Sequence, residues 1–404
     1  MHKILILSYC FPPNAGAHVL RIAKFTKYLT EFNYQPIILT NKKKTKRQDN
    51  SLANDVKDAK IYYSRDIGKT IPGDIRKLFP RFSVPDKLIT WRFTVIKEAL
   101  KIIKKEDVKL IFVSNPPHSI GYIGSIIAKK TKLPFILDFR DEWITFPLFN
   151  NKKHKQLQKE MYREMISNCD GLTFVTKTFQ NRILENLGNT LDIDTEVIYN
   201  GYDESDLPSE TDSKRRRKIR ICYNGRFKKV SDPTIFFKIF CELIENRKID
   251  PKQFEFVFTG DKKTNKKWLQ DFPEINNITR LTGFLSLKKT YKLIATMDIG
   301  LILLTNYKDS STFPLKLFDY MALEKPIIAF LEKKDELSDL ISEYGSSCII
   351  TKKTSNYKER IINFLEKVKN EQVKINHGLR QKFTRKKQTE SLAKFINKRI
   401  NKKS

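Results

Sequence analysis

Residues 3–40 decide the fold of this chain: KILILS at Lys3–Ser8, FPPNAGA at 11–17, a helical pattern over 18–29 and QPIILT at Gln35–Thr40. Each short apolar run is typical of a strand that is buried on both faces. Between the two runs, apolar residues recur at helical spacing after a loop whose proline and glycine residues break regular structure. Strand, loop, helix and strand in this order predict a parallel sheet with helices packed on it.

The same alternation continues along the chain. Further strands are predicted at Lys109–Ser114, Phe135–Asp138, Gly171–Val175 and Glu196–Ile198, and helices around 93–105, 119–130 and 155–168. Residues 203–218 then hold almost no apolar side chains and change charge sign sharply, which indicates an exposed linker. A second series of strands follows at Ile219–Tyr223, Phe254–Thr259, Ile278–Leu281, Ile299–Leu304 and Pro326–Phe330.

This pattern predicts the α/β fold class with two domains in tandem. A chain of 404 residues is too long for one hydrophobic core of ordinary size. We predict a Rossmann-like domain over 1–205, a linker over 206–218 and a second Rossmann-like domain over 219–382. The remaining segment, 383–404, spaces its apolar residues as one amphipathic helix with a very basic opposite face: Leu392, Ala393, Phe395, Ile396 and Ile400.

The composition is strongly basic, with a formal net charge of +31. Residues 351–404 hold 17 Lys and Arg against 4 Asp and Glu, and residues 1–150 hold 27 against 13. Such an excess attracts nucleic acid, a membrane surface or phosphorylated small molecules. A genome composition that favours Lys, Ile and Asn gives the same excess. The basic run KRRRKIR at 214–220 has no interleaved aromatic residues for stacking, so we interpret it as a solvated linker and expect no nucleic-acid partner.

The five cysteines are widely separated and form no C-x-x-C pair. This spacing argues against a zinc site or a disulfide framework and favours a reducing cytoplasm. The apolar stretch at the N-terminus is too short for a signal peptide, and no run approaches the roughly 18 apolar residues of a membrane span. We therefore expect a protein that is soluble or bound to a surface.

Candidate ligand-binding loops follow the predicted strands, because tandem α/β domains bind ligands at the carboxyl ends of their strands. In the first domain these loops are PPNAGA at 12–17, NPPHS at 115–119 and DFRDEW at 138–143. In the second they are NGR at 224–226, TGD at 259–261 and DSSTFPLKLFD at 309–319. Gly16 lets the backbone approach a ligand closely, just ahead of a helix N-terminus that favours anions.

In their order and spacing these segments resemble the family-4 glycosyltransferases of bacterial surface-polysaccharide assembly. The resemblance runs from Lys3 to about Phe395 and rests on KILILSYCFPPNAGA, VSNPPHS, LPFILDFRDEW, VIYNGYD and FPLKLFDYMALEKPIIA. It implies the GT-B fold, in which two Rossmann-like α/β/α domains face each other across a cleft and a C-terminal helix returns to the N-terminal domain. It also implies a retaining hexosyl- or N-acetylhexosaminyltransferase, with a UDP- or GDP-linked sugar as co-substrate and no metal or other cofactor.

The resemblance assigns residues to a donor site. The donor-binding residues that it implies are Gly16, Arg226, Lys229, Gly283, Phe284, Pro314, Leu315, Lys316 and Asp319. Arg226 would neutralise phosphate charge on the leaving nucleotide, with a lysine nearby as its companion. The helix that opens at Pro314 would donate backbone N–H groups to the diphosphate, and the turn at Gly283 would flank the nucleobase.

Two positions depart from the family pattern. Many relatives carry two glutamates with seven residues between them. In this chain Ser311 stands at the position of the first glutamate and Asp319 at the position of the second. A histidine that often follows the strand ending at Asp138 is replaced by Arg140 and Asp141.

The catalytic residues predicted from the resemblance are Arg140, Asp141 and His118. Arg140 or Asp141 would take over a contact with the donor sugar, and His118 would contact the acceptor. Four alternatives remain: an ion pair between Arg140 and Asp141, helix capping by His118, packing by Trp143, and exposure of Asp319 on a helix.

The implied reaction is transfer to a hydroxyl group of a glycan acceptor, typically lipid-linked, in capsule, O-antigen or exopolysaccharide assembly. The basic first domain and the basic C-terminal helix would hold the protein on the anionic inner face of the plasma membrane. The competing hypotheses are a sugar-nucleotide epimerase of the same fold, a non-catalytic relative, and a binding protein recruited by charge.

Overall fold

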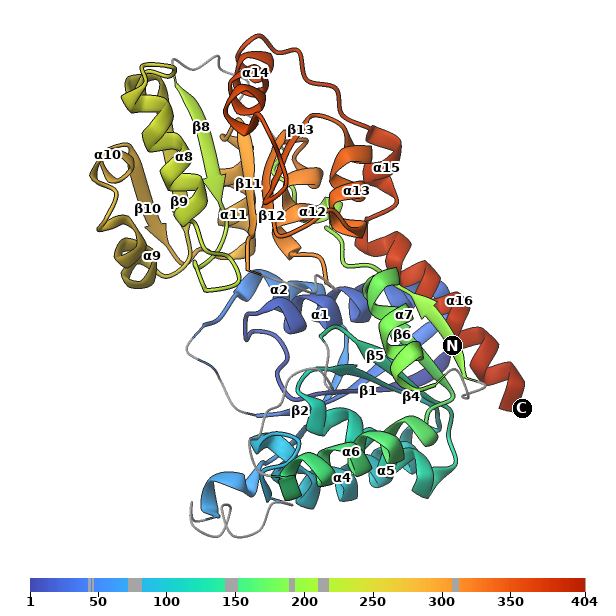
Figure 1. Cartoon of the computed structure of the whole chain (residues 1–404). Helices are drawn as coiled ribbons and strands as arrows, with labels where there is room; N and C mark the ends of the chain where they lie inside the picture. Colours follow the sequence, from blue (N-terminus) through green and yellow to red (C-terminus); the bar gives the residue numbers. More distant parts are fainter. Residues whose placement is uncertain are drawn as a thin grey trace. The chain divides into compact units, whose positions relative to one another are not determined.

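The computed structural model describes residues 1–42, 45, 47–71, 82–141, 152–188, 193–209, 218–306 and 312–403. It divides into two compact units (Figure 1). Unit 1 comprises Met1–Asn200 and Arg385–Ser404, and unit 2 comprises Gly201–Thr384. Trp143, Ser311 and residues 210–217 of the predicted linker lie outside the described residues.

The unit boundaries differ by a few residues from the predicted limits at 205 and 383. The Tyr202 N–H donates to the carbonyl oxygen of Phe383 at 3.1 Å, which pairs the two segments inside unit 2. A Cβ atom on Gly201 would lie 2.0 Å from that oxygen, so only glycine allows the approach. Residues 201–205 and 383–384 therefore belong to the second unit, and the final helix begins at Arg385.

Unit 1 contains one parallel sheet in the strand order β3-β2-β1-β4-β5-β6-β7. Its strands are β1 (His2–Ser8), β2 (Tyr34–Asn41), β3 (Lys60–Ser64), β4 (Val108–Asn115), β5 (Phe135–Phe139), β6 (Gly171–Phe174) and β7 (Asp194–Val197). Its helices are α1 (Ala17–Leu29), η1 (Thr30–Phe32), α2 (Asn50–Asp55), η2 (Ile67–Thr70), η4 (Lys87–Trp91), α4 (Arg92–Glu106), α5 (His118–Thr131), α6 (Lys152–Ser167), α7 (Lys177–Asn186) and α16 (Arg385–Lys403). The strand order reverses between β1 and β4, which is where doubly wound sheets bind ligands.

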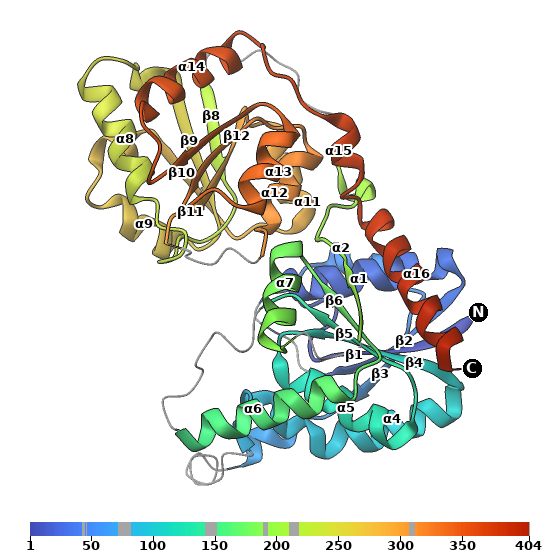
Figure 2. The same cartoon turned by 45° about the vertical axis from the view of Figure 1, so that its right-hand side comes forward.

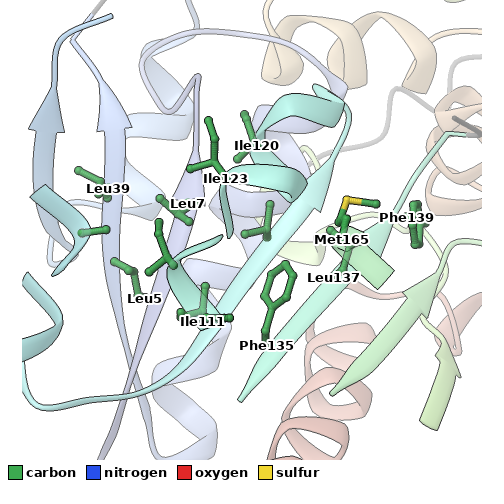
Figure 3. Close-up of a cluster of buried hydrophobic side chains, with 14 of the residues drawn as sticks. Leu5, Leu7, Leu39, Ile111, Ile120, Ile123, Phe135, Leu137, Phe139 and Met165 are labelled. Carbon is green, nitrogen blue, oxygen red and sulfur yellow. The ribbon is translucent and has the colours of Figure 1, made fainter. Parts of the chain in front are cut away.

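Both faces of this sheet are buried, as the unbroken apolar strands predict. Leu5 and Leu7 of β1 lie in the cluster with α4, α5 and α6, whereas Ile4 and Ile6 lie in the cluster with α1 and α16. Figure 3 shows the first cluster, where side chains of β1, β4 and β5 meet Ile120 and Ile123 of α5. Successive strand residues point to opposite faces, so each apolar run packs on two helix layers at once.

The final helix packs on unit 1, as the predicted fold requires. Its five predicted apolar residues are all at most 9% exposed, and α16 lies along α1 in both views (Figures 1 and 2). The Tyr34 hydroxyl donates to the Ala393 carbonyl at 3.4 Å, and Gly171 leaves room for the Phe395 ring. The apolar face of α16 is therefore part of the unit 1 core.

Unit 2 repeats the arrangement with the order β10-β9-β8-β11-β12-β13. Its strands are β8 (Ile219–Tyr223), β9 (Phe254–Thr259), β10 (Thr279–Gly283), β11 (Ile299–Leu304), β12 (Ile327–Leu331) and β13 (Ser347–Thr351). Its helices are η5 (Glu204–Asp206), α8 (Thr234–Glu245), η6 (Pro251–Gln253), α9 (Lys262–Leu269), α10 (Pro273–Asn277), α11 (Leu287–Ala295), α12 (Leu315–Ala322), α13 (Glu336–Tyr344), α14 (Tyr357–Lys369) and α15 (His377–Gln381). The order reverses between β8 and β11, so the second ligand-binding edge is expected there.

A buried ion pair anchors the carboxyl end of the unit 1 sheet. Arg21 of α1 donates to both carboxylate oxygens of Asp138 at 2.9 and 2.8 Å, and neither side chain is exposed. Ser114 and Thr173 donate to the same carboxylate from the flanking strands, at 2.5 and 2.7 Å. Burial alone raises the pKa of the Asp138 carboxyl, but the Arg21 guanidinium and these hydrogen bonds outweigh it, so the pKa is lowered and the group stays ionised.

Replacing Arg21 with Met leaves this carboxylate buried without its cation. We expect the free energy of unfolding of unit 1 to fall by about 3–5 kcal/mol, measured by urea denaturation. Lys101→Ala is the control, because it removes the exposed pair between Lys101 and Glu98 and should cost less than about 1 kcal/mol. Equal losses in the two variants would contradict the role given to the buried pair.

Candidate functional site

Predicted site residues gather at the carboxyl ends of the strands in each unit. In unit 1, Gly16 follows β1, His118 follows β4 and Arg140 follows β5. In unit 2, Arg226 follows β8, and Lys316 lies in the helix that follows β11. Both sets therefore lie at the edge where the strand order reverses.

Arg140 is half-buried and held by neutral oxygen atoms. Its Nε donates to the Ser114 hydroxyl at 2.8 Å, Nη2 donates to the Pro116 carbonyl, and its backbone N–H donates to the Asn115 carbonyl at 3.0 Å. Ser114 in turn donates to Asp138, so the buried ion pair positions Arg140 through one hydroxyl group. Burial lowers the pKa of Arg140 to about 10, which leaves the guanidinium charged at neutral pH.

Two histidines share the surroundings of Arg140. Burial, with the positive charge of Arg140 as a second cause, lowers the pKa of His118 to about 3 and that of His18 to about 4. Both imidazoles are therefore neutral at physiological pH. Asp86 caps α5, because its carboxylate accepts from the Ser119 N–H at 3.0 Å. The capping role considered for His118 thus belongs to Asp86.

Gly16 forms the N-cap of α1 with φ at 150°, a conformation that favours glycine. A Cβ atom there would lie 3.1 Å from the His18 ring, so the glycine keeps the imidazole and the helix start close together. Asp141 is exposed and attracts Arg140 electrostatically. Among the ion pairs within the described part of the chain, none includes Arg140, so the structural ion pair considered for Arg140 and Asp141 is not formed.

Asn224 connects the unit 2 residues. Its amide donates to Asp319 at 3.0 Å and accepts from the Thr259 hydroxyl at 2.8 Å, while its backbone N–H donates to the Tyr320 hydroxyl at 3.1 Å. Asp319 is 8% exposed, so the alternative of a solvent-facing helix residue is wrong. Its neighbour in the helix, Tyr320, fills the space that Gly300 leaves open on β11.

Lys316 places a cation beside the first strand of unit 2. Its ammonium nitrogen lies 3.4 Å from the centroid of the Tyr223 ring, a cation–π contact. Burial lowers the pKa of Lys316, and the Tyr223 side chain opposes this change. A Cβ atom on Gly225 would lie 3.4 Å from the ammonium, so the glycine turn lies directly beside the cation.

The other predicted donor residues of unit 2 lie at the end of β10 and on the segments that follow β8, β10 and β11. Arg226 and Lys229 are exposed after β8, where the Lys229 carbonyl accepts from Asn306 at 3.0 Å. Gly283 ends β10 with φ at 84° and accepts from the Gly260 N–H at 2.9 Å. Phe284 is 49% exposed. Pro314 is the N-cap of α12 and Leu315 is its first residue.

Several polar groups at these edges lack a sequence motif of their own. They are His18, Ser114, Tyr223, Thr259 and Asn265. Asn265 donates to the carbonyls of Gly225 and Thr259 at 3.2 and 2.8 Å, and therefore fixes the glycine turn. Of these five residues, only His18 could have been predicted from the sequence, because it lies two residues after Gly16.

Family models match most of the chain. A model described as Glycosyltransferase Family 4 matches residues 19–206, and one described as Glycosyl transferases group 1 matches residues 218–367. No curated protein matches the sequence.

Solved structures share the fold over nearly the whole chain. A glycosyltransferase from Rickettsia africae is 15% identical, with 100% of this chain and 99% of that chain covered and a TM-score of 0.67. HepE of Anabaena, in complex with UDP and glucose, is 16% identical, with 98% and 100% covered and a TM-score of 0.66. A sucrose-phosphate synthase from Thermosynechococcus elongatus is 10% identical, with 98% and 99% covered and a TM-score of 0.68.

The two tandem sheets and these matches define the GT-B class of glycosyltransferases, as the sequence predicts. Within that class, the chain belongs to glycosyltransferase family 4. No helix in the described ranges is both long enough and apolar enough to cross a bilayer.

The two histidines near Arg140 give a direct test of the unit 1 cluster. We expect imidazole NMR titrations to show His18 and His118 still neutral at pH 5, and Arg140→Gln to raise the pKa of both, because it removes a nearby cation. Since the unfolded chain takes up these protons at a higher pH, the free energy of unfolding falls as pH drops from about 6.5 towards 4. Assignment uses His18→Gln and His118→Gln, and titration of both rings near pH 6.5 would contradict this geometry.

Proposed function

We propose that the chain transfers a hexosyl or N-acetylhexosaminyl group from a UDP- or GDP-sugar to a hydroxyl group of a lipid-linked glycan. The transfer proceeds with retention and serves assembly of a bacterial surface polysaccharide, such as a capsule, a lipopolysaccharide O-antigen or an exopolysaccharide. The observation that carries this proposal is the unit 2 edge, where Lys316 lies close to a buried carboxylate, Asp319, and the exposed Arg226 follows β8 on the glycine turn beside Lys316.

Each part of this edge suits one part of a nucleotide-sugar. The guanidinium of Arg226 and the ammonium of Lys316 neutralise diphosphate charge, and the first turn of α12 adds backbone N–H groups. Asn224 holds one oxygen of Asp319 at 3.0 Å, which leaves the carboxylate oriented to accept from ribose hydroxyls. The Anabaena relative holds UDP and glucose, which supports a uridine donor for this chain.

We propose that the transfer proceeds with retention and without a protein nucleophile. The bond between the anomeric carbon and the diphosphate oxygen breaks, and the acceptor hydroxyl attacks the same face of the sugar. Its proton passes to the departing phosphate oxygen, so atoms and charges balance within the two substrates. The protein positions both substrates and stabilises the developing phosphate charge. Because Arg226 and Lys316 supply positive charge, we propose that no divalent metal is required.

An anionic membrane on the inner face of the cell is the partner that we propose for unit 1. The apolar face of α16 is packed in the core, so the exposed side chains described on this helix are lysines and asparagines, which do not insert into a bilayer. Among the described residues of unit 1, the large apolar side chains that are exposed, apart from Met1, are Tyr63, Ile67 and Phe93, by 55, 39 and 46%, on the neighbouring elements β3, η2 and α4. We call these residues, with Arg65 and Arg92, the aromatic–basic edge.

The members of the aromatic–basic edge lie on neighbouring elements. Ser64 donates to Thr94 at 3.1 Å, so β3, which carries Tyr63 and forms the sheet edge, lies beside the first turn of α4, which carries Phe93. The Arg92 guanidinium lies 4.9 Å from the centroid of the Phe93 ring. Exposed aromatic rings beside arginines suit the boundary between lipid headgroups and acyl chains, and the cations attract anionic lipid.

The donor site is tested by a thermal-shift screen with UDP, GDP, ADP, CMP and their common sugars. We expect one diphosphate nucleotide to raise the melting temperature, and Arg226→Ala to weaken its binding by about 10-fold or more, because a charged hydrogen bond is lost. Arg280→Ala is the control, since Arg280 is exposed and pairs with Glu255 near the opposite end of the strands. With an acceptor present, the product anomer gives the stereochemistry by NMR, and activity should survive EDTA.

Three results would refute this function. Inversion at the anomeric carbon would refute retention, isomerisation of the donor without any acceptor would indicate an epimerase, and nucleotide binding without turnover would indicate a non-catalytic relative.

The membrane proposal is tested by vesicle flotation. We expect binding to vesicles that contain phosphatidylglycerol and little binding to pure phosphatidylcholine, and we expect Tyr63→Ser with Phe93→Ser to reduce binding several-fold. Val230→Ser with Ile235→Ser is the matched control, because it removes two exposed apolar side chains from unit 2. Binding that is indifferent to lipid charge, or to the Tyr63 and Phe93 changes, would refute the role of this edge.

A further inference from the structure

Arg140 is a cation that forms no ion pair with a carboxylate in the part of the chain that the structure describes. Its side-chain hydrogen bonds go to a hydroxyl and a carbonyl oxygen. The nearest buried carboxylate, Asp138, is already neutralised by Arg21 through two hydrogen bonds. Asp141 attracts Arg140 but is exposed, where solvent screens the interaction.

The two histidines beside Arg140 add no second charge. His18 and His118 are neutral, and they offer ring nitrogens that can donate to or accept from hydroxyl groups. The start of α1 at Gly16 has no side-chain cap, so it adds partial positive charge. The site thus combines the Arg140 guanidinium with two neutral imidazoles. This arrangement suits a sugar that bears an oxyanion.

We propose that unit 1 binds an oxyanion carried by the sugar substrate, a carboxylate or a phosphate monoester, through the guanidinium of Arg140. His18 and His118 contact hydroxyl groups of the same sugar. This inference rests on the proposed function and specifies its substrate class. A planar guanidinium matches both oxyanions with two parallel N–H groups, which an ammonium group cannot do.

Arg140 is not needed to bind the donor diphosphate. Unit 2 supplies its own cations to that diphosphate, Arg226 and Lys316, with the exposed Lys228 and Lys229 on the same turn as Arg226. The charge of Arg140 therefore remains for another group. That group belongs either to the transferred sugar or to the acceptor, and the two sources are separated by the experiment.

The experiment measures binding to the full chain by calorimetry, in a donor arm and an acceptor arm. The donor arm compares UDP-glucuronate with UDP-glucose, and the acceptor arm compares glucose 6-phosphate with glucose at saturating UDP. In one arm we expect the anionic ligand to bind about 10-fold or more tightly than the neutral one, because a charge-assisted bidentate contact is made. Arg140→Gln should abolish the preference and Arg140→Lys should restore part of it, while the affinity for UDP alone stays unchanged.

Two results would overturn the proposal. Equal binding of anionic and neutral ligands in both arms would show that no oxyanion is recognised. A loss of UDP affinity in Arg140→Gln as large as the loss for the anionic sugar would show that Arg140 serves the diphosphate. Failure of the proposed function is a separate outcome, because it appears as no UDP or GDP binding even in the unchanged protein.

Discussion

The buried pair of Arg21 and Asp138 is the constraint on which unit 1 depends. One carboxylate at the end of β5 binds a helix through Arg21 and the neighbouring strands through Ser114 and Thr173. The same guanidinium donates to the carbonyls of Ile198 and Tyr199, so it also fixes the chain where it leaves the unit. A buried charge without its partner strongly destabilises the folded state. The helix α1, the strands that contact Asp138 and the segment that leaves the unit are therefore expected to fold together. This ion pair also positions Arg140, because Ser114 donates to Asp138 and accepts from the Arg140 guanidinium.

Unit 2 links its elements through hydrogen bonds of amide side chains in place of an ion pair. Asn224 links the end of β8 to Thr259 on β9 and to Asp319 on α12. Asn265 donates to the Gly225 carbonyl and so holds the glycine turn. Such a network leaves the cations near it, Arg226 and Lys316, free of carboxylate partners among the described residues. Both units therefore hold positive charge ready at the edge of a rigid sheet. In unit 2 this is the electrostatic preorganisation that transfer of a group from a diphosphate requires.

Central strands were predicted more closely than edge strands: of the four edge strands, β7 and β10 were predicted with shifted limits. The apolar runs that became β8, β9 and β11 were predicted with their observed limits, because both faces of these strands are buried. β3 and β13 were not predicted. Each lies at a sheet edge and mixes polar residues into a short run, KIYYS and SCIIT, since one side of an edge strand meets solvent or a loop.

By itself, the sequence determined the two α/β units, the loops that follow the strands, and the basic helix at the end. These are properties of neighbouring residues, such as apolar period, glycine turns and local charge. Only the tertiary structure decided that His18 joins His118 beside Arg140, that Asp319 is buried, and that the apolar face of α16 is covered. Burial and pKa depend on contacts between residues far apart in the chain, and no local pattern encodes those contacts.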